Sequence, residues 1–188
     1  GWGRRSSLYG ETEDYERRFN CQIDGMDYDD KYIFDDLGYN LLPSEISAAF
    51  ALVQLDRLKE NVNNRSDNFH YLSCAISHSP NMRTFETYEN VYTGWLAFPL
   101  MLTGKLKDKR KQVQIYLEKS GIQTRTIFTG NILRQPVSKK FRWDSFGTFG
   151  ASDEVMGNGI LLGCHNQMTR KKLDYTIEKL LEAEKCLA

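Results

Sequence analysis

The chain has 188 residues, and its 25 Lys and Arg residues balance 25 Asp and Glu residues, so the formal net charge is zero. A balanced charge lacks the basic footprint of nucleic-acid-binding proteins, so we expect no nucleic-acid partner. Hydrophobic residues make up 40% and aromatic residues 12% of the sequence, which excludes a disordered chain. No run approaches the ~20 apolar residues of a membrane span, and the start Gly1-Trp2-Gly3-Arg4-Arg5 lacks the apolar core of a signal peptide. We therefore expect a cytoplasmic protein without a membrane partner.

The cysteines and histidines do not show the spacing of a metal site. No C-x-x-C pair is present, which argues against a zinc site and against a disulfide framework. The histidines do not cluster either. We therefore predict no metal and reduced, mostly buried thiols. The residues concerned are Cys21, Cys74, Cys164 and Cys186, and His70, His78 and His165.

The first half of the chain predicts a long loop followed by a long helix. Residues 1–36 carry scattered charges and only short apolar pairs, which is typical of an irregular loop with brief extended pieces. Ser44 is a good N-cap, and apolar residues then recur at roughly helical spacing over 44–79. The stretch 61–68 is rich in poor helix formers, so a kink or a join between two helices is expected there.

The second half predicts alternating strands and helices. Residues 92–102 read as a strand, although Pro99 favours an edge or a bulge. An amphipathic helix is expected over 105–119 and ends at Gly121, and a strand follows at 122–128. Residues 141–149 are compatible with a loop or a short strand. The last predicted elements are a short helix over 151–157 capped by Ser152, a buried strand over 159–164, and a helix over 169–187 whose buried face carries Leu173, Ile177, Leu180 and Leu181.

This order of elements predicts an α/β fold in which helices cover one face of a sheet. Three residues are candidates for chemistry. Asn40 precedes the long helix, where an anion is favoured; Arg134 follows a turn and has a guanidinium suited to phosphate; His165 is a possible acid or base. Taken singly, each is better explained as a turn residue, a surface ion pair or a packed histidine.

Longer motifs, taken in their order and spacing, are more specific than these single residues. The stretch from Lys31 to Leu58 contains Gly38-Tyr39-Asn40, an alanine pair and a Gln-Leu ending, and it resembles the DegT/DnrJ/EryC1/StrS family of sugar aminotransferases and dehydratases. The run from Gly121 to Pro136 resembles the branch that removes the 3-hydroxyl from nucleotide-linked 4-keto-6-deoxyhexoses. Arg134 stands where the aminotransferase branch usually has a histidine. The turn from Gly163 to Thr169 also matches the family.

The resemblance implies an enzyme that uses pyridoxal phosphate or pyridoxamine phosphate, acts on a nucleotide sugar in deoxysugar or lipopolysaccharide biosynthesis, and forms a homodimer. The chain is then the small C-terminal α/β domain of a fold-type I transferase plus the tail of its large domain. Residues 1–43 belong to the large cofactor domain, 44–79 form a linking helix, and 80–188 form the small domain. Asn40 is expected at the cofactor phosphate, and the substrate is expected at Asn131, Arg134, Gln135 and His165.

Two departures from the family pattern limit this expectation. Some related dehydratases have cysteines for an iron–sulfur cluster just after the Trp-Gly-Arg element, where this chain has Arg5-Ser6-Ser7-Leu8-Tyr9, so no cluster is expected. The lysine that forms the aldimine, or the histidine that replaces it in dehydratases, belongs upstream of Trp2. We therefore expect this chain alone to be inactive. The alternatives are a sugar aminotransferase of the same family and a non-catalytic dimerisation or binding module.

Overall fold

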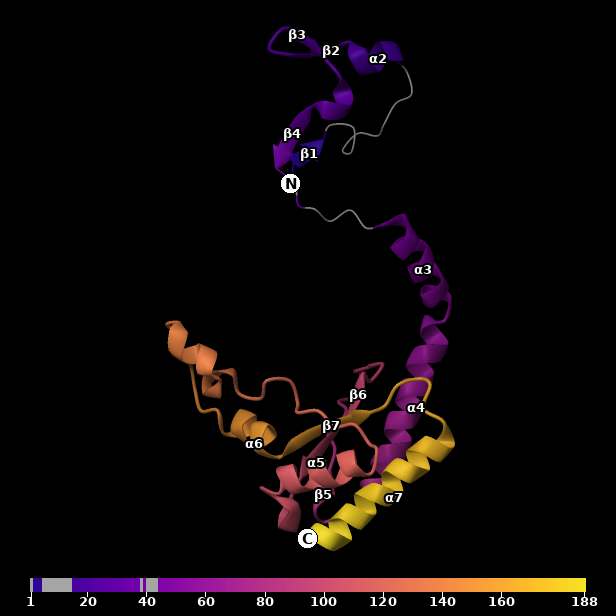
Figure 1. Cartoon of the computed structure of the whole chain (residues 1–188), viewed down its shortest axis with the longest axis vertical. Helices are drawn as coiled ribbons and strands as arrows, with labels where there is room; N and C mark the ends of the chain where they lie inside the picture. The colour runs from indigo at the N-terminus through magenta and orange to yellow at the C-terminus, as the bar shows by residue number, and fades with distance from the viewer. Residues whose placement is uncertain (1, 5–14, 38, 40–43) are drawn as a thin grey trace. The chain divides into compact units, whose positions relative to one another are not determined.

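The computed structural model of the protein describes residues 2–4, 15–37, 39 and 44–188. The chain divides into two compact units, Gly1–Val53 and Gln54–Ala188 (Figure 1). The boundary between the units falls within the helix predicted to link two domains. The assignment of residues 1–43 to a larger cofactor domain and of 80–188 to a smaller one stays a prediction.

The first unit contains short antiparallel pairs of strands. Its elements are β1 (Trp2–Arg4), α2 (Tyr15–Phe19), β2 (Cys21–Ile23), β3 (Met26–Tyr28), the 3₁₀ turn η1 (Asp30–Tyr32) and β4 (Phe34–Leu37). β1 pairs with β4, and β2 pairs with β3. Asp24 and Gly25 join β2 to β3 with φ angles of 51° and 80°, which is the conformation that two-residue hairpin turns favour. The predicted extended pieces are present, but the hairpin and the short helix were not predicted.

The second unit is built on a three-stranded antiparallel sheet with the order β5-β6-β7. Its elements are α4 (Leu58–Ile76), β5 (Met82–Arg83), β6 (Ala97–Leu102), η2 (Gly104–Leu106), α5 (Arg110–Lys119), η3 (Ile132–Arg134), η4 (Pro136–Lys140), α6 (Gly150–Asn158), β7 (Gly159–Gly163) and α7 (Arg170–Leu187). The longest ladder joins β6 to β7, from Ala97 opposite Gly163 to Met101 opposite Gly159. The helix α3 (Glu45–Asp56) precedes α4.

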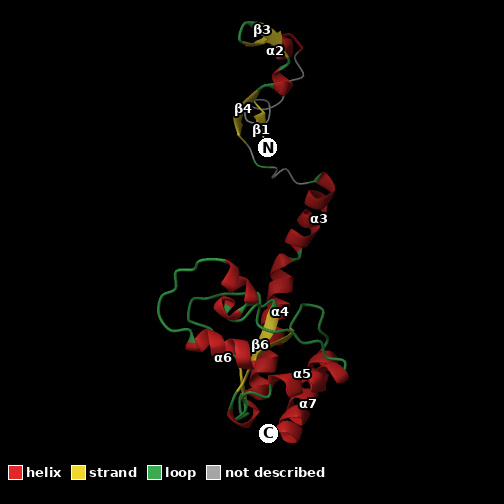
Figure 2. Cartoon of the chain, turned by 60° about the vertical axis from the view of Figure 1, so that its left-hand side comes forward, coloured by secondary structure: helices red, strands yellow, loops and turns green. Residues whose placement is uncertain are grey.

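The helices α4, α5 and α7 cover one face of this sheet, and Figure 2 shows α6 on the other side of β6 from α5 and α7. Alternate side chains of β6 enter the core beneath the three helices, because successive residues of a strand point to opposite faces. This layering confirms the predicted α/β arrangement. The core side chains include Phe98, Leu100 and Leu102 of β6, Ile160 and Leu162 of β7, Leu72 and Ile76 of α4, Val113 and Leu117 of α5, and Leu173 and Leu180 of α7.

The long helix is divided at Arg57 into α3 and α4, so the predicted join between two helices is present but lies before the stretch 61–68, where it was expected. α4 runs through that stretch without a break. Tertiary hydrogen bonds hold its poor helix formers, so that context overrides propensity. The Nδ2 of Asn166 donates to the Oδ1 of Asn61 at 2.6 Å. Further contacts run from Tyr92 to Asn63 and from Asn68 to the carbonyl of His165.

The segment predicted as a strand over 122–128 does not form one. Its only ladder contact is a single bridge in which Arg125 and Leu161 exchange backbone hydrogen bonds of 3.0 and 2.7 Å. The carboxylate of Glu118 instead accepts hydrogen bonds from the backbone N–H of Thr124 at 2.6 Å and from its hydroxyl at 2.9 Å. The segment is therefore tied to α5 rather than paired along the sheet.

β6 begins at Ala97, so the strand predicted from Tyr92 is five residues shorter than expected. Pro99 lies within it, and β5 pairs only with Met101 and Leu102. No strand therefore lies beside Pro99 on the β5 side. β6 is the central strand of the sheet, so the predicted edge strand is wrong, but the missing N–H of Pro99 is tolerated on the side where β5 has already ended.

The sequence predicted two N-caps, Ser44 and Ser152, and one C-terminal stop, Gly121. α3 begins at Glu45, directly after Ser44, which agrees with the first. Gly121 ends α5 with φ of 75°, and the N–H of Ile122 donates to the carbonyl of Leu117 at 2.9 Å, as in a Schellman motif. The prediction for Ser152 is wrong, because α6 begins at Gly150 and Ser152 lies inside the helix. Thr169, which was not predicted as a cap, caps α7 by accepting from the N–H of Lys172.

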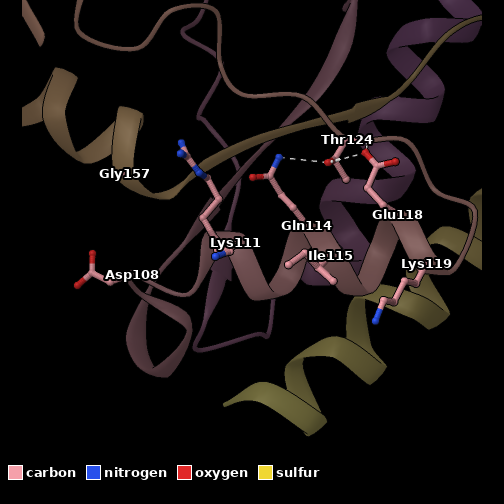
Figure 3. A pocket seen from close by; sticks show the side chains of 9 residues that line it. Asp108, Lys111, Gln114, Ile115, Glu118, Lys119, Thr124 and Gly157 are labelled. Carbon is pink, nitrogen blue, oxygen red and sulfur yellow. Dashed lines mark hydrogen bonds between the residues drawn. The ribbon is translucent and has the colours of Figure 1, made fainter. Parts of the chain in front are cut away.

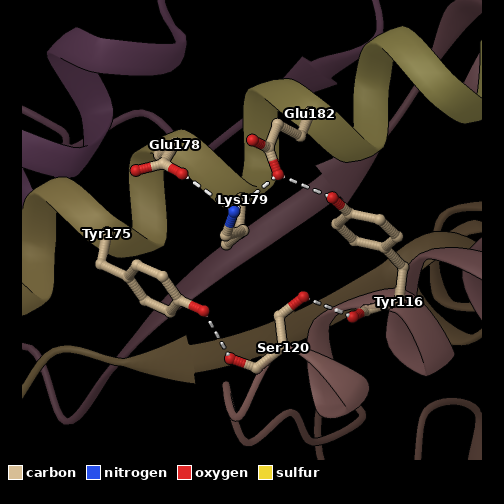
Figure 4. Close-up of polar contacts among 6 residues, drawn as sticks. All are labelled: Tyr116, Ser120, Tyr175, Glu178, Lys179 and Glu182. Carbon is tan, nitrogen blue, oxygen red and sulfur yellow. Dashed lines mark hydrogen bonds and ion pairs between the residues drawn. The ribbon is translucent and has the colours of Figure 1, made fainter.

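Polar side chains join α5 to α7 beside the core (Figure 4). The Tyr116 hydroxyl donates to Glu182 at 2.8 Å, and Lys179 donates to the same carboxylate oxygen at 2.8 Å. The hydrogen bond to Glu182 raises the pKa of Tyr116. The Tyr175 hydroxyl donates to the carbonyl of Ser120 at 3.0 Å. These contacts fix how the two helices lie against each other, while the apolar core supplies most of the stability.

Replacing Leu72 with alanine tests the position of this core. Leu72 is fully buried, so Leu72→Ala should lower the free energy of unfolding by about 2–5 kcal/mol through lost burial and a cavity. Leu58→Ala is the matched control, because Leu58 lies in the same helix but is 52% exposed. Urea unfolding of the chain measures both. Equal losses for the two variants would contradict this core assignment.

Candidate functional site

The loop between α5 and α6 contains three of the predicted site residues, and its backbone is closely fitted to α6. Gly130 has φ of 65°, and a Cβ there would lie 2.5 Å from the Cγ of Met156. Phe128 has φ of 47°, which is strained for an aromatic residue, and its side chain is 82% exposed. Such strain persists where surrounding contacts enforce it, and it is common at binding sites. The loop is therefore a candidate site on conformational grounds as well.

Arg134 and Asn131 meet at one carboxylate, that of Asp153 in the first turn of α6. The Nε and Nη2 of Arg134 donate to the two oxygens of Asp153 at 3.0 and 2.7 Å. The Nδ2 of Asn131 donates to Oδ1 of Asp153 at 2.7 Å, while its own Oδ1 accepts from the N–H of Leu133 at 3.0 Å. Asn131 is buried, whereas the side chain of Arg134 is 65% exposed. The structure thus holds Arg134 in a defined direction at the surface.

These contacts shift both ionisation equilibria toward the charged forms. The hydrogen bonds from Arg134, and then from Asn131, lower the pKa of Asp153 to about 2. The hydrogen bond to Asp153 raises the pKa of Arg134. Asp153 is therefore an anion at neutral pH, which excludes it as a general acid, and its low pKa makes it a weak base. Its role is to accept hydrogen bonds.

Gln135 lies beside this pair and braces the same loop. Its Nε2 donates to the carbonyl of Thr129 at 2.8 Å. Gln135 also lines a cavity of about 170 Å³ together with Phe128, Gly130, Arg110 and other residues of the loop. The Arg110 guanidinium donates to the carbonyl of Met156, and both residues line this cavity. Asn131, Arg134 and Gln135 therefore form one site.

His165 lies apart from these three residues. The loop contacts α6 and the start of β7 at Gly159, whereas His165 follows the end of β7 at Gly163. A five-residue strand spans roughly 16 Å, so the two places are well separated. His165 is exposed, and its Nδ1 accepts from the N–H of Gln167 at 3.2 Å. The assignment of His165 to the substrate stays a prediction.

The structure describes the surroundings of the other predicted residues and groups in less detail. Asn40 and Gly38 lie outside the described residues, as do Arg5 to Tyr9, the stretch from which the absence of an iron–sulfur cluster was predicted. Tyr39 is 89% exposed. Within the described ranges, no group of three or more His, Cys, Asp or Glu residues could hold a metal ion, and no helix is long and apolar enough to span a membrane.

The burial of the cysteines differs from the prediction. Cys164 is buried and Cys21 is half-buried, while Cys74 and Cys186 are exposed. The prediction of mostly buried thiols is therefore wrong. Burial raises the pKa of the Cys164 thiol to about 11, which leaves it unreactive at neutral pH.

A larger cavity of about 790 Å³ lies along α5, and none of the predicted site residues lines it (Figure 3). Its polar side chains bind one another. The Thr124 hydroxyl accepts from Gln114 at 3.1 Å and donates to Glu118 at 2.9 Å. Thr124 is itself buried. These contacts secure the start of the loop to α5, so we interpret this surface as a support for the site rather than as the site.

Comparison with known proteins establishes the family. The model of the DegT/DnrJ/EryC1/StrS aminotransferase family matches residues 10–181, and the chain therefore belongs to this family. This confirms the resemblance carried by the sequence motifs.

Two curated relatives cover most of the chain. The lipopolysaccharide biosynthesis protein RfbH of Salmonella typhimurium is 31% identical over 169 residues, which are 88% of this chain and 39% of the relative. The dTDP-4-dehydro-2,6-dideoxy-D-glucose 3-dehydratase of Saccharopolyspora spinosa is 28% identical over 184 residues, 96% of this chain and 40% of the relative. The chain thus spans about two fifths of the length of these relatives.

A solved structure shows the same fold. The GDP-4-keto-6-deoxy-D-mannose-3-dehydratase of E. coli with bound hydrated PLP matches 94% of this chain with a TM-score of 0.72 at 24% identity, and the match covers 42% of that protein. The predicted fold class, an α/β part of a fold-type I transferase, is therefore confirmed. Asp153 is the site residue that sequence reasoning missed, because nothing in the sequence near it indicates that its partner lies in the preceding loop.

Titration of Asp153 tests the geometry of the site. Arg134→Gln removes the main cause of the lowered pKa, so the pKa should rise from about 2 toward the ordinary value of ~3.9. It should stop short of that value because Asn131 still donates. A lowered pKa stabilises the fold above the ordinary value, and that contribution is lost as pH falls toward 2. NMR titration of the carboxyl carbon measures the change. Arg83→Gln is the control, and an unchanged midpoint in Arg134→Gln would refute the pairing.

Proposed function

We propose that this chain is the C-terminal part of a pyridoxal-phosphate- or pyridoxamine-phosphate-dependent enzyme that removes the 3-hydroxyl from a nucleotide-linked 4-keto-6-deoxy sugar. Membership of the family supports the cofactor. A relative that bears the name of a 3-dehydratase and matches 96% of the chain supports the reaction. The likeness to RfbH supports a place in lipopolysaccharide biosynthesis. The cytoplasmic location and the homodimer expected from the sequence belong to the same proposal.

The observation that carries the proposal is the Arg134 site. An exposed guanidinium held in one direction is suited to the diphosphate of a nucleotide sugar, since a planar fork binds phosphate oxygens bidentately. Asn131 and Gln135 complete the site by holding the loop in place. We assign substrate binding to these three residues and keep His165 as a further candidate.

Asn40 is the residue of this chain that we assign to the cofactor. An amide donor before the start of a helix suits a phosphate oxygen, and we assign Asn40 to the cofactor phosphate of the partner subunit. When bound, the cofactor supplies the electron sink that lets the hydroxyl leave. The described residues contribute the binding and orientation of the nucleotide sugar.

Two alternatives remain. A sugar aminotransferase is supported by the name of the family. A dimerisation or binding module is supported by α3, which has no buried residue and exposes Ile46, Phe50 and Leu55. Exposed apolar residues in one helix indicate a surface that another body covers.

The reaction of the complete protein separates the two enzymes. The protein encoded with its upstream sequence should convert a nucleotide-linked 4-keto-6-deoxyhexose, in the presence of pyridoxamine phosphate, to a product that lacks the 3-hydroxyl. Mass spectrometry and NMR of the product identify it, with GDP-linked and dTDP-linked substrates tested side by side. An amino sugar would favour the aminotransferase, and no turnover of any substrate would contradict both enzymes.

The chain of 188 residues alone is expected to form no covalent adduct with pyridoxal phosphate at a defined site. The reason is that the residue working with the cofactor is placed upstream of Trp2. Absorbance spectroscopy of the chain mixed with the cofactor measures this, with a surface-lysine peptide as the control for nonspecific reaction. A specific, stoichiometric band would overturn the proposed division of the active site.

A further inference from the structure

The pairing of Arg134 with Asp153 uses one side of the guanidinium and leaves the other open. Asp153 accepts from Nε and from Nη2, at 3.0 and 2.7 Å. An arginine has five N–H donors, so both hydrogens of Nη1 and the second hydrogen of Nη2 stay available. These donors form the end-on edge of the fork, the edge that can bind a phosphate bidentately. Since the side chain is 65% exposed, this edge is accessible.

We propose that Asp153 is a positioning residue for the substrate: its carboxylate holds Arg134 from the side so that the end-on edge meets the diphosphate of the nucleotide sugar. This inference rests on the proposed function. A flexible arginine loses side-chain entropy when it binds a ligand, and an arginine that is already ordered loses less. Asp153 therefore strengthens binding without touching the substrate.

The loop and the helix α6, which hold Asp153, are themselves anchored by hydrogen bonds. Asn131 donates to the same carboxylate, so the acceptor is held by the loop as well as by α6. The far end of α6 is secured by buried Asn158, whose Oδ1 accepts from the N–H of Asp108 at 2.6 Å. The carboxylate thus stands on an anchored helix, and positioning groups act best from rigid elements.

Asp153 also has an effect on phosphate binding that opposes positioning, and the two effects change the affinity in opposite directions when Asp153 is removed. A carboxylate next to Arg134 partly neutralises its charge, and if this competition with phosphate dominated, removing Asp153 would tighten binding. If positioning dominates, removing Asp153 weakens binding, and it does so only while Arg134 is present. A double-mutant cycle distinguishes these cases, because residues that act through one another are not additive.

The test uses the complete enzyme and measures KM and kcat for the nucleotide sugar in Arg134→Ala, Asp153→Ala and the double variant. Arg134→Ala should raise KM roughly 10- to 100-fold, the range expected for a lost hydrogen bond to a charged group. Asp153→Ala should raise KM roughly three- to tenfold, which corresponds to one side chain that is no longer pre-ordered. The double variant should match Arg134→Ala. All three should leave kcat nearly unchanged, because the diphosphate is bound equally before and during the reaction.

The matched control is Glu154→Ala, which removes the neighbouring carboxylate of α6 and its surface ion pair with Arg83. It should leave KM unchanged. Asp153→Asn, which keeps one acceptor and loses the charge, replaces Asp153→Ala if that variant does not fold. Losses that add in the double variant, or an unchanged or lower KM in Asp153→Ala, would overturn the role of Asp153 alone. An unchanged KM in Arg134→Ala would instead overturn the proposed substrate contact and this inference with it.

Discussion

The ladder between β6 and β7 is the constraint on which the second unit depends. Its five paired positions carry alternate apolar side chains into the core beneath α4, α5 and α7. Both ends of β7 are glycines, and at Gly159 a Cβ would lie 2.6 Å from Ile127 and from the carbonyl of Val155. Because the backbone approaches so closely there, the ladder fixes where α6 ends and where the loop after α5 passes. The candidate site is therefore placed by the sheet rather than by the loop itself.

The carboxylate of Asp153 then organises the side chains of the candidate site. Three donors from the loop converge on it, and its pKa of about 2 shows that the anion is the stable form. The low pKa that accompanies these hydrogen bonds also makes Asp153 a weak base. We therefore propose a role in substrate binding, rather than in proton transfer, for this part of the chain.

The spacing of apolar residues predicted those helices and strands that local sequence is sufficient to determine. α5, β7 and α7 were found because buried residues recur at the spacing of a helix or strand and because Gly121 marks the end of a helix. The hairpin at Asp24-Gly25 was also readable, since that dipeptide is a strong turn signal, but the charged surroundings concealed it. Tertiary contacts decided the rest. The hydrogen bonds of the asparagines in α4 and the bond of Thr124 to Glu118 join residues that no local pattern connects. The pairing of Arg134 with Asp153, nineteen residues apart, is of the same kind.

The motifs predicted the family, and the structure identified Asp153 as the hydrogen-bond partner of Arg134 and Asn131. The central claim is that Arg134, ordered by Asp153, faces the diphosphate of a nucleotide sugar. The most direct measurement is a crystal structure of the complete enzyme with a bound nucleoside diphosphate. The account predicts phosphate oxygens within hydrogen-bonding distance of Nη1 and Nη2 of Arg134, with Nε still on Asp153. A nucleotide bound away from Arg134, or an Arg134 that leaves Asp153 to reach it, would contradict the account.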